Sequence, residues 1–172
     1  MIRPATPADV AAVARVQVAS WEAVYRGLMP DAVIDSFAVE SRTEQWTRFL
    51  AAERADRIAL VADHDGEVVG MASLGASRDP SHDPVAVGEL QAIYVAPDHW
   101  DHGHGRDLMD AAITWLRSRG FTEAFLWVLT GNTRARRFYE AAGWQPDGIR
   151  IEVLAGGSLE ETRYRVRVGP VG

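Results

Sequence analysis

A short loop with two glycines offers the clearest chemistry in this sequence. Gly103 and Gly105 lie between an apolar segment and a helix-forming one, and Arg106 follows directly. The first N–H groups of a helix have no partner within the helix, and the helix dipole places partial positive charge there. Glycine lets an anion come close to the backbone, and the arginine adds a full charge. The loop is therefore predicted to bind a pyrophosphate.

Two strands and two helices position this loop. An apolar strand is expected over Glu89–Val95, and a helix from Arg106 to about Arg119. A second apolar strand covers residues 125–128, and a polar break follows at residues 131–132. The last helix carries residues 138–144. A strand that ends in a glycine turn and opens a helix is the arrangement that the anion site needs.

A second block of spaced residues follows the loop: Asn132-x-x-Ala135-x-x-x-Tyr139-Glu140-x-x-Gly143-Trp144. Over about a third of the chain, the two blocks together resemble the acetyl-CoA-binding core of the GNAT N-acetyltransferases. In that family the loop reads Gln/Arg-x-x-Gly-x-Gly/Ala. Here the two small residues match, whereas Trp100 replaces the usual Gln or Arg, and His102 stands where Arg or Lys is common. A tight turn without a ligand would explain the two glycines alone, but it would not explain the second block.

The resemblance implies a site for acetyl-CoA as co-substrate. The cofactor phosphates would accept hydrogen bonds from the backbone of five residues: His102, Gly103, His104, Gly105 and Arg106. The pantetheine arm would pair with the backbone of Ile93, Tyr94 and Val95, as an added strand does, and a backbone N–H there would polarise the thioester carbonyl. Asn132 has two roles open to it, a cap on the following helix or a contact with the cofactor arm.

The resemblance also implies two residues for the chemistry. Tyr139 would protonate the departing thiolate, a mildly uphill transfer, since reference pKa values are about 10 for tyrosine and about 8.5 for a thiol. A role as a core aromatic is the alternative, because Phe138 beside it has packing to do. Glu89 would accept a proton from the amine, directly or through water, because an alkylammonium with a pKa of about 10.4 is almost fully charged at pH 7. An exposed carboxylate at a strand end is the alternative for Glu89.

Composition narrows the class of protein. The chain has 172 residues, 47% of them hydrophobic, with a net charge of −6. This acidity argues against a nucleic-acid partner or an anionic membrane, and favours a cationic partner such as an amine. Cysteine is absent, so neither a disulfide nor a thiol acyl-enzyme is available. No apolar run approaches the length of a membrane span and the N-terminus is not a signal peptide, so a cytoplasmic protein is expected.

Two aromatic residues are candidates for the acceptor site. Trp21 and Tyr25 are four residues apart and share a helix face. In the family the first helices line the acceptor site, but aromatic pairs at this spacing also pack in cores. The loop over residues 79–84 is a candidate rim. The acceptor stays open among a free amino acid, a polyamine, an aminoglycoside-like antibiotic and a peptide N-terminus.

The histidines of the loop raise the question of a metal. His99, His102 and His104 lie beside Asp98 and Asp101. Metal-binding histidines normally have orienting second-sphere partners, and no such signature accompanies this group. The cofactor hypothesis already uses the same segment. No metal is expected.

The remaining elements indicate one α+β domain over residues 1–172. A short strand, a Thr6–Asp9 capping box and a helix to about Arg26 come first. A short helix is expected over residues 31–37, and a capping box at Ser41–Glu44 is expected to open another helix. The other expected strands are 58–62, 68–74, 149–154 and 162–168, the first two joined by a hairpin turn at His64-Asp65-Gly66 and the last two separated by a break at residues 155–158.

This order predicts a mixed, mostly antiparallel sheet flanked by helices. The GNAT resemblance implies the same layout, with a splayed strand pair near Val95 and Leu126. The leading hypothesis is an N-acetyltransferase that moves an acetyl group from acetyl-CoA to a primary amine by direct attack in a ternary complex, with a homodimer possible. A non-catalytic acyl-CoA-binding or regulatory module is the alternative. A dinucleotide oxidoreductase is disfavoured, because Leu108 stands where its fingerprint needs a third glycine.

Overall fold

The computed structural model describes residues 1–52, 54–154 and 157–169. Its helices are η1 (Pro7–Asp9), α1 (Val10–Tyr25), α2 (Asp31–Asp35), α3 (Val39–Ala51), η2 (Pro97–His99), α4 (His104–Ser118) and α5 (Thr133–Ala141). Its strands are β1 (Ile2–Pro4), β2 (Arg57–His64), β3 (Glu67–Ala76), β4 (Val87–Val95), β5 (Glu123–Leu129), β6 (Gln145–Leu154) and β7 (Gly157–Arg167). Within the described ranges, no helix is both long enough and apolar enough to cross a membrane.

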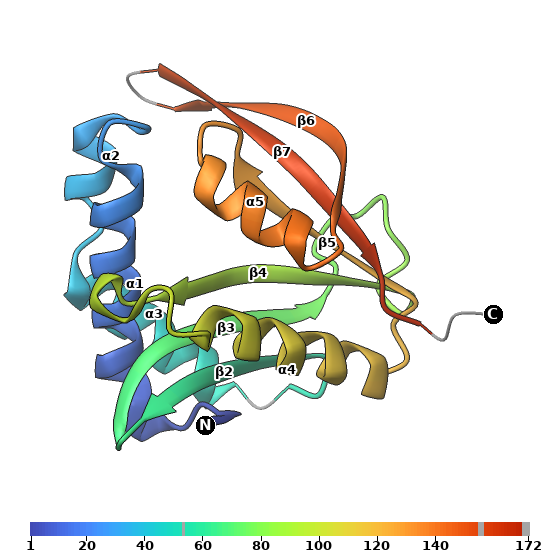
Figure 1. The fold of residues 1–172 in the computed structure, drawn as a ribbon, viewed down its shortest axis with the longest axis horizontal. Coiled ribbons are helices and arrows are strands. Elements are labelled where there is room, and N and C mark those ends of the chain that lie inside the picture. Colours follow the sequence, from blue (N-terminus) through green and yellow to red (C-terminus); the bar gives the residue numbers. More distant parts are fainter. Residues whose placement is uncertain (53, 155–156, 170–172) are drawn as a thin grey trace.

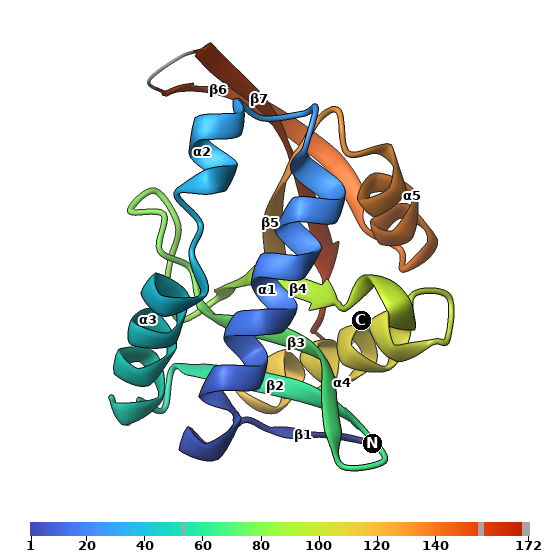
Figure 2. The same cartoon turned by 90° about the vertical axis from the view of Figure 1, so that its left-hand side faces the viewer.

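In the described ranges, seven strands form one sheet in the order β1-β2-β3-β4-β5-β7-β6. Among these seven strands β4 and β5 run parallel, and the other neighbouring pairs are antiparallel. Helices cover both faces. One core cluster joins α1 and α3 to the sheet, and another joins α4 and α5 to its opposite face (Figures 1 and 2). The predicted α+β class with a mostly antiparallel sheet is confirmed.

The parallel pair separates soon after it begins. Residues 87–89 of β4 pair with residues 123–125 of β5, and no further pairs follow between these strands. Figure 1 shows the two strands diverging from this end. Just beyond the last pair, the β3 register passes from Leu90 to Ala92, so Gln91 is an extra, bulged residue. The splayed central pair predicted from the resemblance is present.

Local sequence accounts for several of these elements. The β2–β3 hairpin turns at Asp65 and Gly66, whose φ angles of 53° and 85° suit a turn that needs two left-handed residues. At the paired start of β4, a Cβ on Gly88 would lie 2.5 Å from the Leu116 side chain of α4, so glycine lets this helix pack closely on the strand. The hairpin sets β2 against β3, and the close contact sets α4 against β4.

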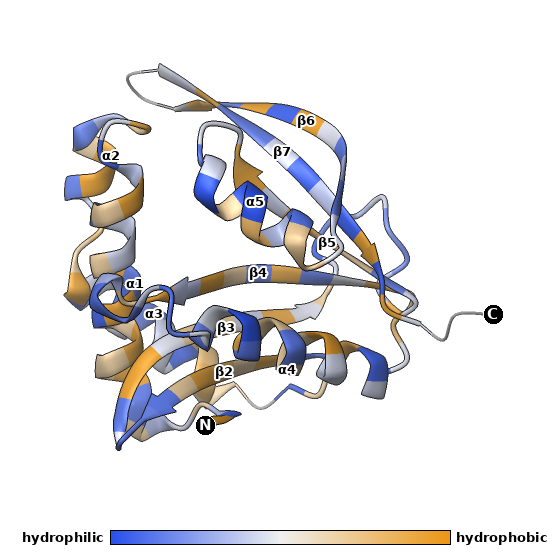
Figure 3. Ribbon diagram, in the orientation of Figure 1, coloured by the Kyte–Doolittle hydropathy of each residue, from blue (hydrophilic) through white to orange (hydrophobic). Residues whose placement is uncertain are grey.

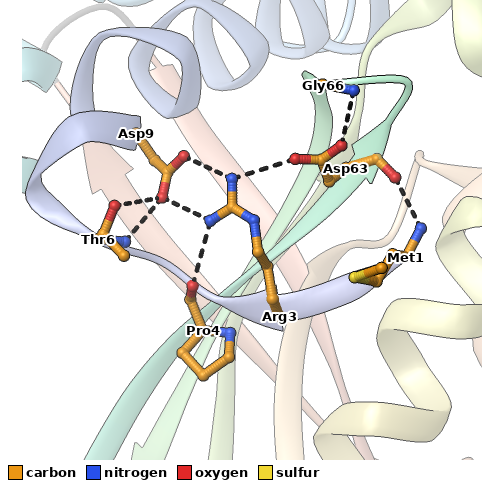
Figure 4. A network of polar contacts seen from close by, with 7 residues as sticks. All are labelled: Met1, Arg3, Pro4, Thr6, Asp9, Asp63 and Gly66. Carbon is orange, nitrogen blue, oxygen red and sulfur yellow. Dashed lines mark hydrogen bonds and ion pairs between the residues drawn. The ribbon is translucent and has the colours of Figure 1, made fainter.

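The N-terminus is held by a buried carboxylate (Figure 4). Asp9 accepts two hydrogen bonds from the Arg3 guanidinium, at 2.8 and 2.9 Å, and two more from the backbone N–H and hydroxyl of Thr6. Arg3 also reaches Asp63 at the end of β2, at 3.2 Å. The predicted Thr6–Asp9 capping box is present, and its acidic member also ties η1 to β1 and β2.

One predicted helix start is wrong. The Ser41–Glu44 capping box does not open a helix, because α3 begins at Val39 with Ala38 as its N-cap. The Ser41 hydroxyl instead donates to the Ala38 carbonyl at 2.9 Å, within the helix. Val39 packs against the core cluster that contains Trp46, and this burial places the start earlier than the polar signature does. Of the break predicted after Leu154, residues 155–156 lie outside the described residues.

Candidate active site

The glycine loop leaves a row of backbone donors free. Gly103 is the N-cap of α4 and has a φ of 88°, a left-handed conformation that favours glycine. The helix begins at His104, two residues before the predicted start, and its first bond runs from the Asp107 N–H to the Gly103 carbonyl. Within the described residues, no backbone N–H from residue 102 to residue 106 donates to a backbone carbonyl. These groups fit the diphosphate of a coenzyme A molecule.

Trp100 fastens the loop to the end of β4. Its indole N–H donates to the Val95 carbonyl at 2.7 Å, and the Arg134 guanidinium lies 4.5 Å from the centre of its ring. Arg134 also forms an ion pair with Asp101 at 2.9 Å. The same Val95 carbonyl accepts the Ser20 hydroxyl of α1 at 3.0 Å. Trp100 therefore fastens the loop to β4, at the sequence position where the family has Gln or Arg.

The β4 backbone presents hydrogen-bonding groups to the gap. The Ala96 N–H donates to the Val69 carbonyl of β3. In an antiparallel ladder, alternate residues direct their backbone N–H and C=O groups to the same neighbouring strand. The backbone groups of Tyr94 therefore face β3, and those of Ile93 and Val95 face away from it. Because the Val95 carbonyl is already used, the Ile93 N–H and carbonyl and the Val95 N–H are the groups that face the diverging strands. This register favours Ile93 and Val95 over Tyr94 among the predicted backbone contacts.

Three tyrosines meet at the open end of the gap. Tyr139 reaches it from α5 and is only 8% exposed. Burial raises the pKa of Tyr139 well above its usual value, and nearby Tyr94 adds to the effect. Burial also raises the pKa of Tyr25, with further contributions from Tyr94 and Tyr139. At neutral pH the Tyr139 hydroxyl is therefore a neutral proton donor.

Trp21 belongs to the same aromatic group. Its indole N–H donates to the Tyr94 hydroxyl at 2.9 Å, and its ring stacks on Phe37 with centroids 3.5 Å apart. A cavity of about 310 Å³ lies just past Tyr25, between Leu28, the end of β5 and the start of β7. The structure thus places both predicted acceptor residues at this end of the gap, but their acceptor-binding role stays a prediction.

Glu89 is buried and paired at the closed end of the gap. It is 6% exposed and occupies the last position at which β4 pairs with β5. Arg78 donates to its carboxylate from the side-chain Nε and Nη2 and from the backbone N–H. Because Gly88 faces α4, the neighbouring Glu89 points to the opposite face of the sheet. The alternative of an exposed carboxylate is wrong, and the sequence did not indicate Arg78 as the partner of Glu89.

Asn132 and the α5 arginines have structural partners. The Asn132 carboxamide accepts the Ala135 N–H at 3.1 Å and caps α5, so its capping role is observed, whereas its cofactor contact stays a prediction. Arg136 donates to the Tyr164 hydroxyl of β7 at 3.0 Å and to the Thr130 carbonyl. Together these bonds fix the helix that carries Tyr139.

Four histidines gather beside the loop. His64 of the β2–β3 hairpin joins the predicted trio of His99, His102 and His104, with ring centroids 5.2 to 6.4 Å apart. Desolvation lowers the pKa of His104, with smaller contributions from His64 and His99, and keeps its imidazole neutral. Over the part of the chain that the structure describes, no three His, Asp or Glu side chains are placed to hold a metal ion.

Comparison with known proteins places this geometry in a family. The model of the acetyltransferase (GNAT) family matches residues 21–144. An uncharacterized N-acetyltransferase of Bacillus subtilis, YuaI, is 29% identical over 93% of this chain and 88% of its own. An aminoglycoside N(6')-acetyltransferase type 1 of Stenotrophomonas maltophilia is 33% identical over 84% of this chain and 85% of its own. The PaiA N-acetyltransferase of Thermoplasma acidophilum, solved with coenzyme A, superposes with a TM-score of 0.73 at 21% identity, over 94% of this chain and 96% of its own.

These matches agree with the splayed strand pair and the free donors of the glycine loop. The fold and site define an acetyl-CoA-dependent acyltransferase. The chain belongs to the GNAT family of acetyltransferases.

Proposed function

We propose that this protein transfers an acetyl group to a primary amine of a small molecule or peptide, by direct attack in a ternary complex. Acetyl-CoA, bound along β4 and at the start of α4, supplies the acetyl group as a thioester. The observation that carries the proposal is the convergence of free backbone donors and a buried, neutral Tyr139 on the same gap between β4 and β5. The backbone N–H groups of the loop hold the phosphates, and an N–H of Ile93 or Val95 polarises the carbonyl.

Two side chains divide the proton transfers between them. Tyr139 gives its hydroxyl proton to the departing sulfur. Burial keeps the hydroxyl neutral beforehand and, because it raises the pKa of Tyr139, makes the transfer more uphill than the reference pKa values imply. Glu89 receives the amine proton. It lies five residues before Tyr94 on β4, roughly 16 Å away at about 3.3 Å per residue, so it acts through intervening water. The ion pair with Arg78 holds the carboxylate on the acceptor side of the sheet.

Two tyrosine variants test this proposal. Calorimetric titration with acetyl-CoA is expected to give micromolar binding, equivalent to about −8 kcal/mol. Tyr139→Phe is expected to keep this affinity and to lower turnover about 100-fold, because only the proton donor is lost. Tyr25→Phe, the matched control in the same aromatic group, is expected to change KM more than kcat.

Full turnover in Tyr139→Phe would show that another group protonates the sulfur. Binding of acetyl-CoA without turnover on any amine would favour the non-catalytic alternative. No binding at millimolar acetyl-CoA would overturn the proposed co-substrate. The domain limits of residues 1–172 and the cytoplasmic location stay predictions.

The proposed partner beyond the acceptor is a second copy of the chain, paired through β6. This strand is an edge of the sheet, and Ile149, Ile151 and Val153 are 65%, 58% and 82% exposed. Figure 3 shows hydrophobic and hydrophilic residues alternating along it. Antiparallel pairing about a twofold axis at Ile151 would set Ile149 against Val153 and Arg150 against Glu152, so apolar meets apolar and opposite charges meet. An exposed apolar edge strand is a ready site for such pairing.

Charge exchange across the axis provides the test. Arg150→Glu and Glu152→Arg are each expected to give monomers in analytical ultracentrifugation, because like charges would then face each other. The double variant restores opposite charges and is expected to restore the dimer. Equal association by all four proteins, or a monomeric wild type at high micromolar concentration, would refute pairing through β6.

A further inference from the structure

A cationic cavity lies on the side of the sheet opposite α4. Its volume is about 500 Å³, and it is bounded by α3, the start of β2, the end of β3 and the bulge of β4. The charged residues that line it are four arginines and one aspartate: Arg48, Arg54, Arg57, Arg78 and Asp56. We refer to it as the arginine cavity. The chain as a whole carries a net charge of −6, so this lining is a local reversal of the overall charge.

Two of the four arginines have strong carboxylate partners. Arg54 pairs with Asp56, and Arg78 pairs with Glu89 just outside the lining. These pairs are neutral as units. They leave Arg48 and Arg57 to set the charge of the cavity.

Arg48 and Arg57 are weakly engaged. Arg48 approaches Glu44 at 3.9 Å, with both side chains more than three-quarters exposed, an arrangement that contributes little. Arg57 lies 4.1 Å from the centre of the Phe49 ring and donates through Nη2 to the Phe49 carbonyl at 3.0 Å. Its Nε is buried and, within the described residues, has no hydrogen-bond partner. A guanidinium fork with unused donors matches the planar oxygens of a carboxylate or phosphate.

The arginine cavity adjoins the proposed reaction site. Arg78 lines the cavity and also donates to Glu89. Gln91, the bulged residue of β4, lines the cavity as well. Gln91 lies two residues before Ile93, roughly 7 Å along the strand. The lining of the cavity therefore comes within two residues of Ile93 on β4. It lies on the face opposite α4, the helix whose N-terminus is proposed to hold the cofactor phosphates.

We propose that the arginine cavity binds an anionic group of the acceptor, a carboxylate or phosphate borne by the molecule whose amine is acetylated. The inference rests on the proposed function and narrows it to amino acids, short acidic peptides or phosphorylated amines. It replaces the cationic acceptor expected from net charge, because the local charge at the site decides recognition and the overall charge does not.

The first arm of the test measures anion binding without catalysis. A ¹⁵N-labelled sample is titrated with inorganic phosphate and with acetate at low ionic strength, and the Gln91 side-chain amide is followed by NMR. A saturable shift is expected in the wild type. Arg48→Gln is expected to bind about tenfold more weakly, and Arg57→Lys severalfold more weakly, because lysine keeps the charge but loses the fork.

The control for this arm is Arg15→Gln, which removes the same charge from an exposed position on α1. It is expected to match the wild type within twofold. No saturable shift at Gln91, or equal losses in Arg15→Gln and Arg48→Gln, would overturn the inference.

The second arm compares matched acceptors in the acetylation assay. Each carboxylated amine is paired with its carboxamide, and each phosphorylated amine with its unphosphorylated form, which separates the two anion chemistries. The wild type is expected to prefer one anionic series at least tenfold in kcat/KM. Arg48→Gln should lose that preference, chiefly through a higher KM for the anionic member of each pair.

The two proposals fail in different ways. If acetyl-CoA does not bind at all, the proposed function is wrong, and the NMR titration still tests whether the cavity binds anions. If both members of every pair are acetylated equally well, the enzyme assignment stands and the anion inference alone is wrong.

Discussion

Two buried carboxylates in this protein are each held by an arginine, yet their surroundings differ. Asp9 and Glu89 are 7% and 6% exposed. Thr6 donates two further hydrogen bonds to Asp9, and Arg3 is itself shared with Asp63. Because four hydrogen bonds surround the Asp9 carboxylate, we call this pair closed. Glu89 depends on Arg78 alone, whose side chain is 66% exposed in a loop beside a cavity. A closed pair stabilises a fold, whereas a pair with one open side can exchange partners during a reaction.

Neutralising each carboxylate in turn should separate these roles most clearly. Glu89→Gln is expected to lower kcat about 100-fold because the amine loses its proton acceptor. Its unfolding free energy should change little, since Arg78 becomes solvated. Steady-state kinetics and urea unfolding on the same sample measure both. An unchanged kcat would mean that the amine loses its proton elsewhere, and Glu89 would then be a structural partner of Arg78.

Asp9→Asn is expected to show the opposite pattern. Breaking a buried, hydrogen-bonded pair costs several kcal/mol, and because Arg3 is one-third exposed the loss should be about 2 kcal/mol. Turnover at a temperature where the variant is folded should match the wild type. Asp31→Asn, at an exposed position on α2, is the matched control and should stay within about 0.5 kcal/mol of wild type. Similar losses in both variants would argue against a special role for Asp9.

Arg78, the arginine paired with Glu89, is exposed, yet substituting it should lower activity. Arg78→Lys keeps the charge and the backbone N–H bond to Glu89 but loses the two-pronged side-chain contact. We expect kcat/KM to fall about tenfold with little change in unfolding free energy. Arg54→Lys, beside it in the arginine cavity and paired with Asp56, is the control. An effect as large in Arg54→Lys would show that the loss does not depend on the contact with Glu89.

The contribution of the Arg3–Asp9 pair to stability should decrease gradually as the pH is lowered. The Arg3 guanidinium, with Thr6, holds the pKa of Asp9 well below its usual range. The stability that this pair contributes is therefore complete above about pH 5 and is lost as pH falls below the unfolded-state value near 4. Urea unfolding between pH 7 and pH 3 should show the difference between wild type and Asp9→Asn shrinking with acid. A difference that stays constant over this range would show that the shift in pKa is absent.

The features of the fold and site that could be predicted from the sequence alone are local ones. The glycine turn before α4, the Asp65-Gly66 hairpin and the Thr6–Asp9 box each act over a few neighbouring residues, and the structure contains all three. The failed box at Ser41 shows the limit of such signals. There a polar pattern suited to a helix start lies inside α3, because burial of Val39 extends the helix backward.

The rest depends on contacts between distant segments, which no local pattern encodes. Arg78 and Glu89 are eleven residues apart along the chain, and they meet because β3 and β4 are paired. His64 joins the loop histidines from a hairpin about 40 residues earlier. Arg48 and Arg57 look like ordinary surface arginines until α3 and β2 come together around one cavity. Local patterns therefore indicate the glycine loop and the Trp21–Tyr25 pair, but not the arginine cavity.

The carbonyl oxygen of Val95 connects the two halves of this site. It accepts Ser20 from α1, the helix that carries Trp21, and Trp100 from the loop that ends at Gly103. In the proposed complex the loop holds the cofactor and α1 adjoins the acceptor, so the two ligands would be linked through one shared atom. By reciprocity, any factor by which one ligand tightens the other must act equally in the reverse direction. If this link exists, Ser20→Ala should bring that factor close to one, and the two substrates would then bind independently of each other.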